Sequence, residues 1–376
     1  MNFKNSRESA LAELDNFTNN EITNYNRNRN FDYGPENRKN VSMLSPYITH
    51  RLITEYETIK KVLRKFPYQK VEKYIQEIFW RVYWKGWLEQ RPDVWSDFLV
   101  DLKKINEDKN YLKAINGETE IKCFNDWVHE LKKYNYLHNH TRMWFASIWI
   151  FTLKLPWQLG AEFFLKYLYD GDSASNTLSW RWVAGLHTKG KIYIAKDWNI
   201  QKFTNNRFDN INLNENPSPI ISDKEYSPSN FTFKNRSSEN EYLLVFDNKI
   251  SNKIIRQLKK NYKKIYVVIV NNDDRKIKLS EKVLQFKGEL ANNTFKNTDN
   301  VEIINSNKSH EIFKEFKSLD AIYPYVGENQ DYILKLKSKY NLDLNYIYDE
   351  FDIFCWQFSK KGFFSFKQNI PKILAK

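Results

Sequence analysis

Cysteine is scarce in this sequence. Only Cys123 and Cys355 occur among 376 residues, they lie far apart, and neither belongs to a cluster with metal-ligand spacing. These facts argue against a disulfide framework and against an iron–sulfur cluster. We therefore expect a reducing, cytoplasmic setting and no bound metal.

Long apolar runs are also missing. No stretch approaches the roughly 18 apolar residues that a membrane span needs, and the segment 1–8 is polar from its start. The sequence thus predicts neither a secreted nor an integral membrane protein. A chain of 376 residues is longer than one core usually organises, so we expect about two domains, in a monomer without a membrane partner.

Acidic residues are outnumbered by basic ones. The 59 Lys and Arg exceed the 46 Asp and Glu, which gives a formal charge of +13 and a pI near 9.3. Such an excess favours a polyanionic partner. Lys, Asn and Ile are abundant while Gly and Ala are scarce, so a compositional bias explains the charge equally well. Composition leaves both explanations open.

Tryptophan is distributed unevenly along the chain. Eleven of the 12 tryptophans precede residue 200, and only Trp356 follows. Between the two compositions lies a segment, 209–240, that is rich in Asn, Ser and Pro and has no apolar periodicity. Such a segment is typical of a linker. We predict a helical domain over 1–208, a linker over 209–240 and an α/β domain over 241–376.

Before the linker the apolar periodicity is helical. It predicts helices over 52–66, 71–87 and 157–169, and a long apolar stretch over 136–155 that stops at a proline. No strand-like alternation interrupts these segments. The first domain is therefore expected to be all-α, with an aromatic interior.

After the linker, short β-rich runs alternate with amphipathic stretches. Strands are predicted over 242–246, 265–270, 301–304, 321–325 and 344–347, and helical stretches over 250–262, 279–290, 310–319 and 330–340. Strands separated by helices form a parallel, doubly wound, Rossmann-like sheet. No Gly-x-Gly-x-x-Gly follows the first strand, which argues against a dinucleotide site in this half.

One segment of the helical half, 40–47, places small hydroxyls just before a helix start. Free amides at such a position bind phosphate oxygens. An ordinary helix cap requires the same residue types, so the segment alone does not decide between the two interpretations.

Tyr74, Glu77 and Arg81 share one face of a predicted helix, with Trp80 and Trp84 beside them. A surface Glu77–Arg81 pair would be an ordinary ion pair worth a few tenths of a kcal/mol. The flanking aromatic rings instead favour a lined pocket, in which a partly buried carboxyl exchanges a proton.

Asn139, Arg142 and Met143 likewise share a face of the following helical stretch. His138 and His140 are two residues apart and would point to different sides of a helix. We therefore predict no metal site there.

The most specific stretch runs from Asp170 to Trp182 and reads Asp-Gly-Asp-Ser-Ala-Ser-Asn-Thr-Leu-Ser-Trp-Arg-Trp. It resembles the hallmark of the flavin-binding helical domain of the photolyase and cryptochrome family. That hallmark is Asp-Gly-Asp, an amide four residues after the second Asp, then Trp-x-Trp. Further segments resemble family motifs in the family's order: Tyr25 to Arg29, Ser42 to Pro46, Glu77 to Arg81 and Leu137 to Met143.

The resemblance covers roughly residues 5–210 and, more faintly, the α/β half, where 362–366 is similar to the family's Gly-x-Tyr-x-Phe. Family members usually place the α/β domain first. This chain therefore resembles a permuted version, with 209–240 joining the two domains.

The resemblance implies FAD as the cofactor. The phosphates would lie against the 41–45 segment, an Arg142–Asp170 pair would lie beside the flavin ring, and Asn176 would face flavin N5. Signalling relatives tend to carry Asp or Cys there, so an amide favours repair. The residues implied to hold FAD are Tyr25, Val41, Ser42, Leu44, Ser45, Tyr74, Glu77, Arg81, Asn139, Arg142, Asp170, Asp172 and Asn176.

The resemblance also implies a pocket for a flipped pyrimidine dimer in UV-damaged DNA. Its substrate-binding residues would be Trp80, Asn139, Met143, Trp182 and Arg29. Glu77 would hydrogen-bond the dimer as a catalytic group. Relatives that repair the (6-4) lesion carry two histidines where Asn139 and Met143 stand, so the cyclobutane dimer is favoured.

Two further catalytic positions, Trp157 and Trp180, match inner members of the family's tryptophan electron chain. The outer member has no tryptophan counterpart between Trp95 and Trp127, so a tyrosine is a candidate to complete the path. Core packing explains both indoles equally.

Several positions depart from the family pattern. Val41 replaces a Thr, Tyr74 a Trp, and His140 an Arg expected near DNA phosphate, while 178–179 replaces a Gly-Gly pair. The loss of Arg at His140 predicts a weaker contact with the duplex at neutral pH.

The expected function is light-driven, FAD-dependent splitting of cyclobutane pyrimidine dimers. The alternatives are a cryptochrome-like photoreceptor, a (6-4) photolyase, and a flavin-free basic protein that binds nucleic acid. A folate or deazaflavin antenna stays open: Glu328 lies near the place of a folate-contacting carboxylate, and a solvated loop acid explains it equally.

Overall fold

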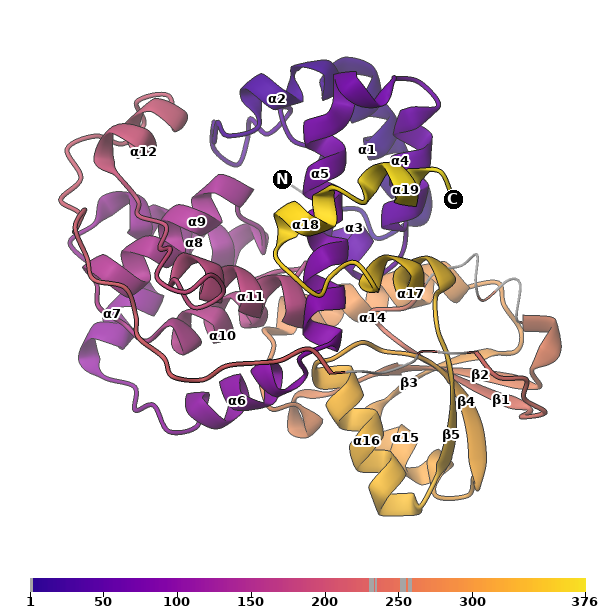
Figure 1. Cartoon of the computed structure of the whole chain (residues 1–376). Helices are drawn as coiled ribbons and strands as arrows, with labels where there is room; N and C mark the ends of the chain where they lie inside the picture. The colour runs from indigo at the N-terminus through magenta and orange to yellow at the C-terminus, as the bar shows by residue number, and fades with distance from the viewer. Residues whose placement is uncertain (1–2, 230–232, 234, 251–254, 256–258) are drawn as a thin grey trace.

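The computed structural model describes residues 3–229, 233, 235–250, 255 and 259–376. A helical part made from the first half of the chain lies against a sheet with its own helices, and a long segment without helix or strand runs between them (Figure 1). The predicted fold class, helical first and α/β second, is confirmed.

Helices account for the first half. They are α1 (Arg7–Asn20), α2 (Tyr25–Asn28), α3 (Ser45–Thr49), α4 (Glu55–Leu63), α5 (Tyr68–Glu89), α6 (Asp93–Leu102), α7 (Lys109–Asn116), α8 (Lys122–Tyr134), α9 (Asn139–Ser147), α10 (Trp157–Tyr167), α11 (Ser173–Val183) and α12 (Asp197–Phe203). Prolines 67 and 156 cap α5 and α10. The side chains of Thr54 and Asp108 cap α4 and α7, because their oxygens accept hydrogen bonds from backbone amides of the first helical turn.

The aromatic interior predicted for this half is present. Trp127, Trp144, Trp149 and Trp180 are at most 2% exposed. The α10 glycine Gly160 lies so close under the Trp180 ring that a Cβ would overlap it. Indoles therefore supply much of the burial that holds α8, α9, α10 and α11 together.

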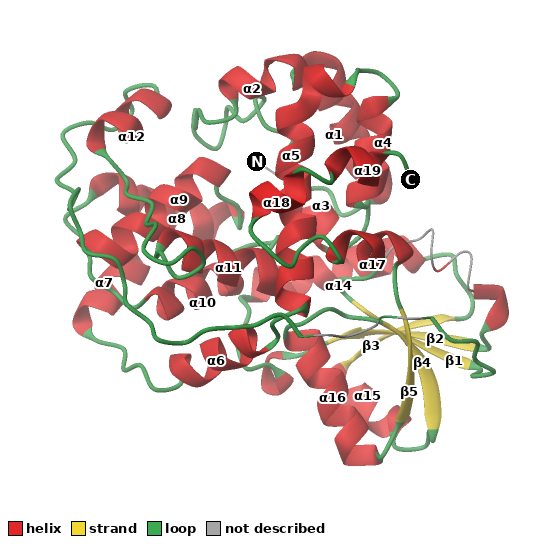
Figure 2. Ribbon diagram, in the orientation of Figure 1, coloured by secondary structure: helices red, strands yellow, loops and turns green. Residues whose placement is uncertain are grey.

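The second half forms a five-stranded parallel sheet in the order β3-β2-β1-β4-β5 (Figure 2). The strands are β1 (Tyr242–Phe246), β2 (Lys264–Ile269), β3 (Val301–Asn305), β4 (Ser318–Ile322) and β5 (Asp343–Ile347), joined by α14 (Glu281–Phe295), α15 (Ser306–Phe313) and α16 (Glu328–Tyr340). β1 pairs with β2 from Tyr242 opposite Lys264 and with β4 on its other side. The chain reverses its direction of growth between β1 and β4, where open α/β sheets bind ligands.

The end of the chain returns to the helical half. Helices α17 (Glu350–Trp356), α18 (Phe363–Lys367) and α19 (Ile370–Leu374) follow the sheet, and α17 and α18 pack against α5. Gly86 makes this contact possible, because a Cβ there would come within 2.5 Å of the Trp356 ring.

Most predicted elements are found, with several corrections. The stretch 136–155 is α9 followed by a π-helical turn, Ile148–Thr152, rather than one helix. The predicted helix 310–319 is wrong in its second half, because α15 ends at Phe313 and β4 begins at Ser318. The β4 strand accordingly lies three residues earlier than predicted. The prediction at 250–262 falls largely outside the described residues.

The segment 209–240 has no helix or strand among its described residues, yet it is fixed to the helical half. Tyr226 donates to Asp97 at 2.8 Å, and the amide of Ser229 donates to the carbonyl of Gln90 at 2.8 Å. The domain boundaries remain a prediction. No helix in the described part of the chain combines the length and apolarity that crossing a bilayer requires.

Candidate functional site

The loop before α3 places Ser42 beside Tyr74 of α5. Met43 adopts a left-handed φ of 50°, which turns the chain, and Leu44, 1% exposed, anchors it. Burial raises the pKa of Tyr74 although the Ser42 hydroxyl acts against that rise. The Tyr25 ring stands edge-on to Tyr74, with centroids 5.2 Å apart.

An Arg–carboxylate pair joins α9 to the loop before α11. Arg142 Nη2 donates to Asp170 Oδ2 at 2.9 Å, and their side chains are 22% and 2% exposed. Burial alone would raise the pKa of Asp170, but Arg142, the Ser45 hydroxyl and Arg81 hold it below its ordinary value. Asp170 is therefore ionised at neutral pH, and its Oδ1 has no hydrogen-bond partner among the described residues.

Arg81 approaches the same carboxyl-bearing loop through Thr49. Arg81 donates through Nη2 to Thr49 Oγ1. The Thr49 hydroxyl in turn donates to the backbone oxygen of Asp170 at 3.4 Å. The Nε of Arg81 is buried without a partner in the described part of the protein. Thr49, which follows Ser45 by one turn of α3, is not among the residues predicted from the sequence.

Asp172 and Asn176 lie at the start of α11. Asp172 Oδ1 accepts from the amide of Ser175 at 2.8 Å and its Oδ2 is 3.9 Å from Lys85 Nζ. Asn176, 8% exposed, donates through Nδ2 to the carbonyl of Ala161 at 2.8 Å. The capping hydrogen bond to Ser175 therefore fixes the side chain of Asp172, and the hydrogen bond to Ala161 of α10 fixes the side-chain amide of Asn176.

Glu77 lies on the partly exposed side of α5. Its side chain is 37% exposed and its Oε1 is 4.0 Å from Arg29 Nε. Burial raises its pKa, although Arg29 and Lys73 lower it. Glu77 does not form the alternative surface ion pair with Arg81, because Arg81 turns to Thr49. A carboxyl of this kind can donate as well as accept a hydrogen bond.

Two indoles expected to contact substrate each have an aromatic partner. Trp80 stacks on Phe363 of α18 with centroids 3.7 Å apart and planes 13° apart. Trp182 stacks on Tyr193 at 5.6 Å and 28°. Both indoles remain half-buried. The helices that carry them, α5 and α11, pack against each other.

The α9 residues divide between site and scaffold. Asn139 is exposed and Met143 half-buried. His138 Nδ1 accepts from the amide of His140 at 3.2 Å. His140 lies 2.9 Å from the Asn30 carbonyl and 3.2 Å from the Tyr193 hydroxyl. The two histidines thus serve local hydrogen bonds.

Trp157 and Trp180 have different surroundings. Trp180 packs edge-on to Trp149, with centroids 6.1 Å apart, and Trp149 is in edge contact with Tyr111 at 6.0 Å. Trp157 stacks on Phe98 at 5.5 Å. All these rings are at most 7% exposed, so core packing is one role they certainly have.

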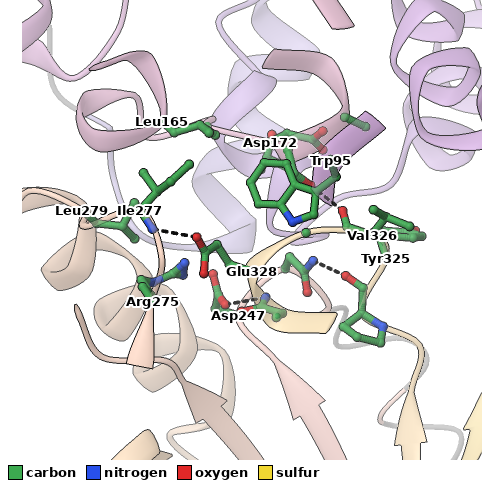
Figure 3. A pocket seen from close by; sticks show the side chains of 18 of the residues that line it. Trp95, Leu165, Asp172, Asp247, Arg275, Ile277, Leu279, Tyr325, Val326 and Glu328 are labelled. Carbon is green, nitrogen blue, oxygen red and sulfur yellow. Dashed lines mark hydrogen bonds between the residues drawn. The ribbon is translucent and has the colours of Figure 1, made fainter. Parts of the chain in front are cut away.

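A small cavity lies where the helical half meets the carboxyl ends of β1 and β4 (Figure 3). It holds about 70 Å³, enough for a few water molecules. Glu328 lines it and accepts from the amides of Ile277 and Lys276 at 2.8 and 3.1 Å. Glu328 is therefore an anchored cavity residue rather than a solvated loop acid.

The residues of the helical half fit the chemistry of FAD. Ser42 and Ser45 offer hydroxyls, and Tyr25 offers an aromatic ring. Asp170 Oδ1 and Arg81 Nε are buried polar atoms that have no hydrogen-bond partner within the described ranges. Such a set suits a ligand with phosphates, hydroxyls and a polar heteroaromatic ring. Glu77, Asn139 and Arg142 stay partly accessible beside it.

Comparison with known proteins also indicates an FAD-binding domain. Residues 74–211 match the FAD binding domain of DNA photolyase. A deoxyribodipyrimidine photo-lyase of Streptomyces griseus is 32% identical over 150 residues, 39% of this chain and 33% of the relative. One of Agrobacterium fabrum is 27% identical over 183 residues, 47% of this chain and 37% of the relative. The matches thus span about a third of the length of these relatives.

Solved structures give weaker similarities. A bacterial class III photolyase from Agrobacterium tumefaciens has a TM-score of 0.46 and 25% identity over 53% of this chain and 43% of its own. A Synechocystis cryptochrome has a TM-score of 0.48 and 21% identity over 54% and 44%. Residues 74–211 thus match the FAD binding domain of DNA photolyase, and the chain is similar to deoxyribodipyrimidine photo-lyases over less than half of its length.

Proposed function

We propose that this protein is a light-driven, FAD-dependent lyase that splits cyclobutane pyrimidine dimers in UV-damaged DNA. The observation that carries the proposal is Glu77: a carboxyl with a raised pKa, 37% exposed, one helical turn before Trp80 and Arg81. It combines a proton donor, a stacking surface and a flavin-side guanidinium on one helix.

Each element of the site has a separate task in this reaction. Light-excited, fully reduced FAD would supply one electron to the dimer and receive it back after the ring opens, so the cleavage is redox-neutral. FAD would be held by residues of the helical half: Ser42, Ser45, Arg81, Arg142, Asp170, Asp172 and Asn176. The indoles of Trp80 and Trp182 would pack against the flipped bases, with Asn139 and Met143 as the facing wall.

Glu77 would hydrogen-bond the dimer. A carboxyl with a raised pKa retains its proton at higher pH than an ordinary glutamate. In its protonated form it would donate to a pyrimidine carbonyl, where negative charge accumulates on the substrate. Arg29, 4.0 Å away, opposes that effect, and a bound substrate that excludes water strengthens both interactions.

DNA is the polyanionic partner that the net charge of +13 would attract. His140 contributes little to that attraction, because burial lowers its pKa and its ring nitrogens face Asn30 and Tyr193. Phosphate contact at this place must therefore come from neighbouring cations such as Arg29, which supports the weaker duplex contact expected from the sequence.

The test is repair of a dimer-containing oligonucleotide by protein loaded with reduced FAD, under blue light and in darkness. Repair is expected in light alone. Glu77→Ala should lower the repair yield about tenfold, because it removes the hydrogen bond to the dimer, whereas the amide of a Gln would still donate. Glu72→Ala is the matched control: Glu72 is on the same helix and its side chain is 38% exposed, but it pairs with Lys367.

Absence of light-dependent repair with reduced FAD bound would refute the proposal. A flavin protein that fails in this way but changes its conformation in light would be a photoreceptor. Repair of (6-4) lesions instead of cyclobutane dimers would correct the substrate. A preparation that does not take up FAD would point to a flavin-free protein.

A further inference from the structure

A residue of the chain's last segment contacts an indole of the candidate site. Phe363 of α18 stacks on Trp80 of α5, with centroids 3.7 Å apart and planes 13° apart. The two residues are 283 positions apart in sequence, one before the sheet and one after it. The segment that carries Phe363 is therefore part of the candidate substrate site in space, although not in sequence.

Phe363 is rigidly held. It is 6% exposed, stands edge-on to Tyr83 at 5.5 Å and lies next to Phe366 at 6.0 Å. Phe366 is fully buried and contacts Phe79 of α5 at 5.9 Å. The α18 helix thus inserts a pair of rings, one turn apart, into the side of α5.

Hydrogen bonds hold the residues that precede α18 to the two residues that directly follow α5. Gln90 Nε2 donates to the carbonyl of Trp356 at 2.8 Å, and Arg91 Nη2 donates to the carbonyl of Lys360 at 2.7 Å. After α18, Ile370 and Ile373 are at most 1% exposed. A segment anchored on both sides in this way is a fixed part of the fold, not a lid that opens for substrate.

Trp80 nevertheless keeps part of its surface accessible. Phe363 covers one face of the Trp80 indole. The Trp84 ring also contacts this indole, at a tilt of 38° and with centroids 5.1 Å apart. The indole therefore has few orientations open to it. An aromatic ring with its plane fixed in advance loses less entropy when a base stacks on it.

We propose that Phe363 is a positioning residue that fixes the indole of Trp80 for stacking on the flipped pyrimidine, so that the α/β half completes the lesion site of the helical half. The inference rests on the proposed function, because it assigns Trp80 to the substrate. It adds a residue outside the FAD-binding domain as a determinant of affinity for the lesion.

The test uses Phe363→Leu, which keeps an apolar side chain of similar size but removes the flat ring, in the full-length protein. Affinity for a dimer-containing oligonucleotide should fall about three- to tenfold, the range that loss of an aromatic pair predicts. The rate of repair at saturating substrate and the amount of bound FAD should not change. Phe364→Leu is the matched control, since Phe364 is the next residue of the same helix and is 84% exposed.

A double-mutant cycle separates positioning from general weakening of the fold. In a Trp80→Leu background, Phe363→Leu should have no further effect on affinity for the lesion, because its effect passes through Trp80. Phe363→Tyr, which retains the ring, should restore affinity. An undiminished effect of Phe363→Leu without Trp80 would overturn the inference.

Fluorine NMR of protein labelled with 5-fluorotryptophan tests the contact without DNA, with Trp80→Phe to assign the signal. Phe363→Leu should shift the Trp80 resonance, and Phe364→Leu should leave it in place. If the resonance shifts while lesion affinity is unchanged, the positioning role is wrong. If the unchanged protein shows no preference for dimers over undamaged DNA, the proposed function fails, and with it the role of Trp80.

Discussion

Asp170 shows at the scale of one residue how the fold prepares a charged group. One carboxylate oxygen is bonded to Arg142 at 2.9 Å, and the other is buried without a partner among the described residues. A buried, unbonded carboxylate oxygen is costly unless something else binds it. The arrangement is thus more favourable with a polar ligand present than without one.

We predict that Asp170→Asn lowers the amount of FAD retained on purification at least several-fold. The amide keeps the shape but removes the charge that pairs with Arg142, and the free energy of unfolding should fall by about 1–3 kcal/mol. Flavin absorbance per protein and urea unfolding measure the two effects. Asp15→Asn is the control: Asp15 pairs with Lys61 at 2.7 Å but is 53% exposed, so its loss should change neither quantity. Full retention of FAD by Asp170→Asn would contradict the assignment.

Local chemistry explains which site residues the sequence could supply. Asp172 and Asn176 lie at the start of α11, which the sequence Asp-Gly-Asp predicts. Arg142 lies on α9, as the helical spacing of Asn139, Arg142 and Met143 predicts. Thr49 was missed, because its role depends on Arg81, which arrives from α5, an element distant in sequence. No spacing within one segment records such contacts.

Glycine positions reveal packing at the scale of elements. In α5, a Cβ on Gly86 would come within 2.5 Å of the Trp356 ring and 2.6 Å of the Ser359 hydroxyl, whereas nothing lies within 4 Å of a Cβ on Gly288 in α14. Both glycines are in helix interiors, where alanine is intrinsically preferred. The difference between them is therefore the neighbouring element.

We predict opposite signs for the same substitution at these two sites. Gly86→Ala should lower the free energy of unfolding by about 1–3 kcal/mol, because α17 must move away from α5. Gly288→Ala should raise it by about 0.5–1 kcal/mol, because it meets only solvent. Urea unfolding of both variants measures the effects. Equal stabilisation by both would show that α17 does not pack on α5 as described.

Element boundaries follow from the sequence where a local signal ends them. The α5 and α10 helices begin after prolines, and β1 has the predicted bounds. The error at 310–319 arose because Phe316 and Leu319 continue the apolar spacing of α15. In the structure the chain turns after Phe313, and Leu319 already belongs to β4. Periodicity cannot separate a helix from a strand that follows it after four residues.

A buried ionic network joins the two halves at the scale of the molecule. Arg51 contacts Asp352 at 2.6 Å and Glu55 at 2.8 Å, and Lys249 lies 3.0 Å above the Tyr325 ring. These side chains come from the α3–α4 loop, the start of α4, the loops that follow β1 and β4, and α17. The sequence predicted both halves, but not this interface or the return of the last helices, because both arise from pairing between distant segments.

Glu89 makes the stability of this interface depend on pH. Its carboxyl accepts from the Tyr323 hydroxyl at 2.7 Å and the Val326 amide at 2.8 Å. Burial raises its pKa to about 7, although Tyr323, Val326 and Lys249 act against that rise. The folded protein thus binds a proton that the unfolded chain, with an ordinary glutamate pKa, has lost. This group's contribution to stability is complete below about pH 4.5 and is lost as pH rises toward about 7.

We predict that Glu89→Gln removes this loss, since the amide matches the protonated carboxyl: its oxygen accepts from Val326 and its NH₂ donates to the Tyr323 hydroxyl. At about pH 8 the variant should be more stable than the unchanged protein by up to about 3 kcal/mol, and at about pH 4.5 the two should be equal. His50, whose pKa burial lowers to about 4, contributes an opposite slope to both proteins, so only their difference isolates Glu89. Urea unfolding at the two pH values measures it. A difference that does not grow with pH would show that Glu89 is ionised in the folded protein, and that Lys249 stabilises it as the charged form.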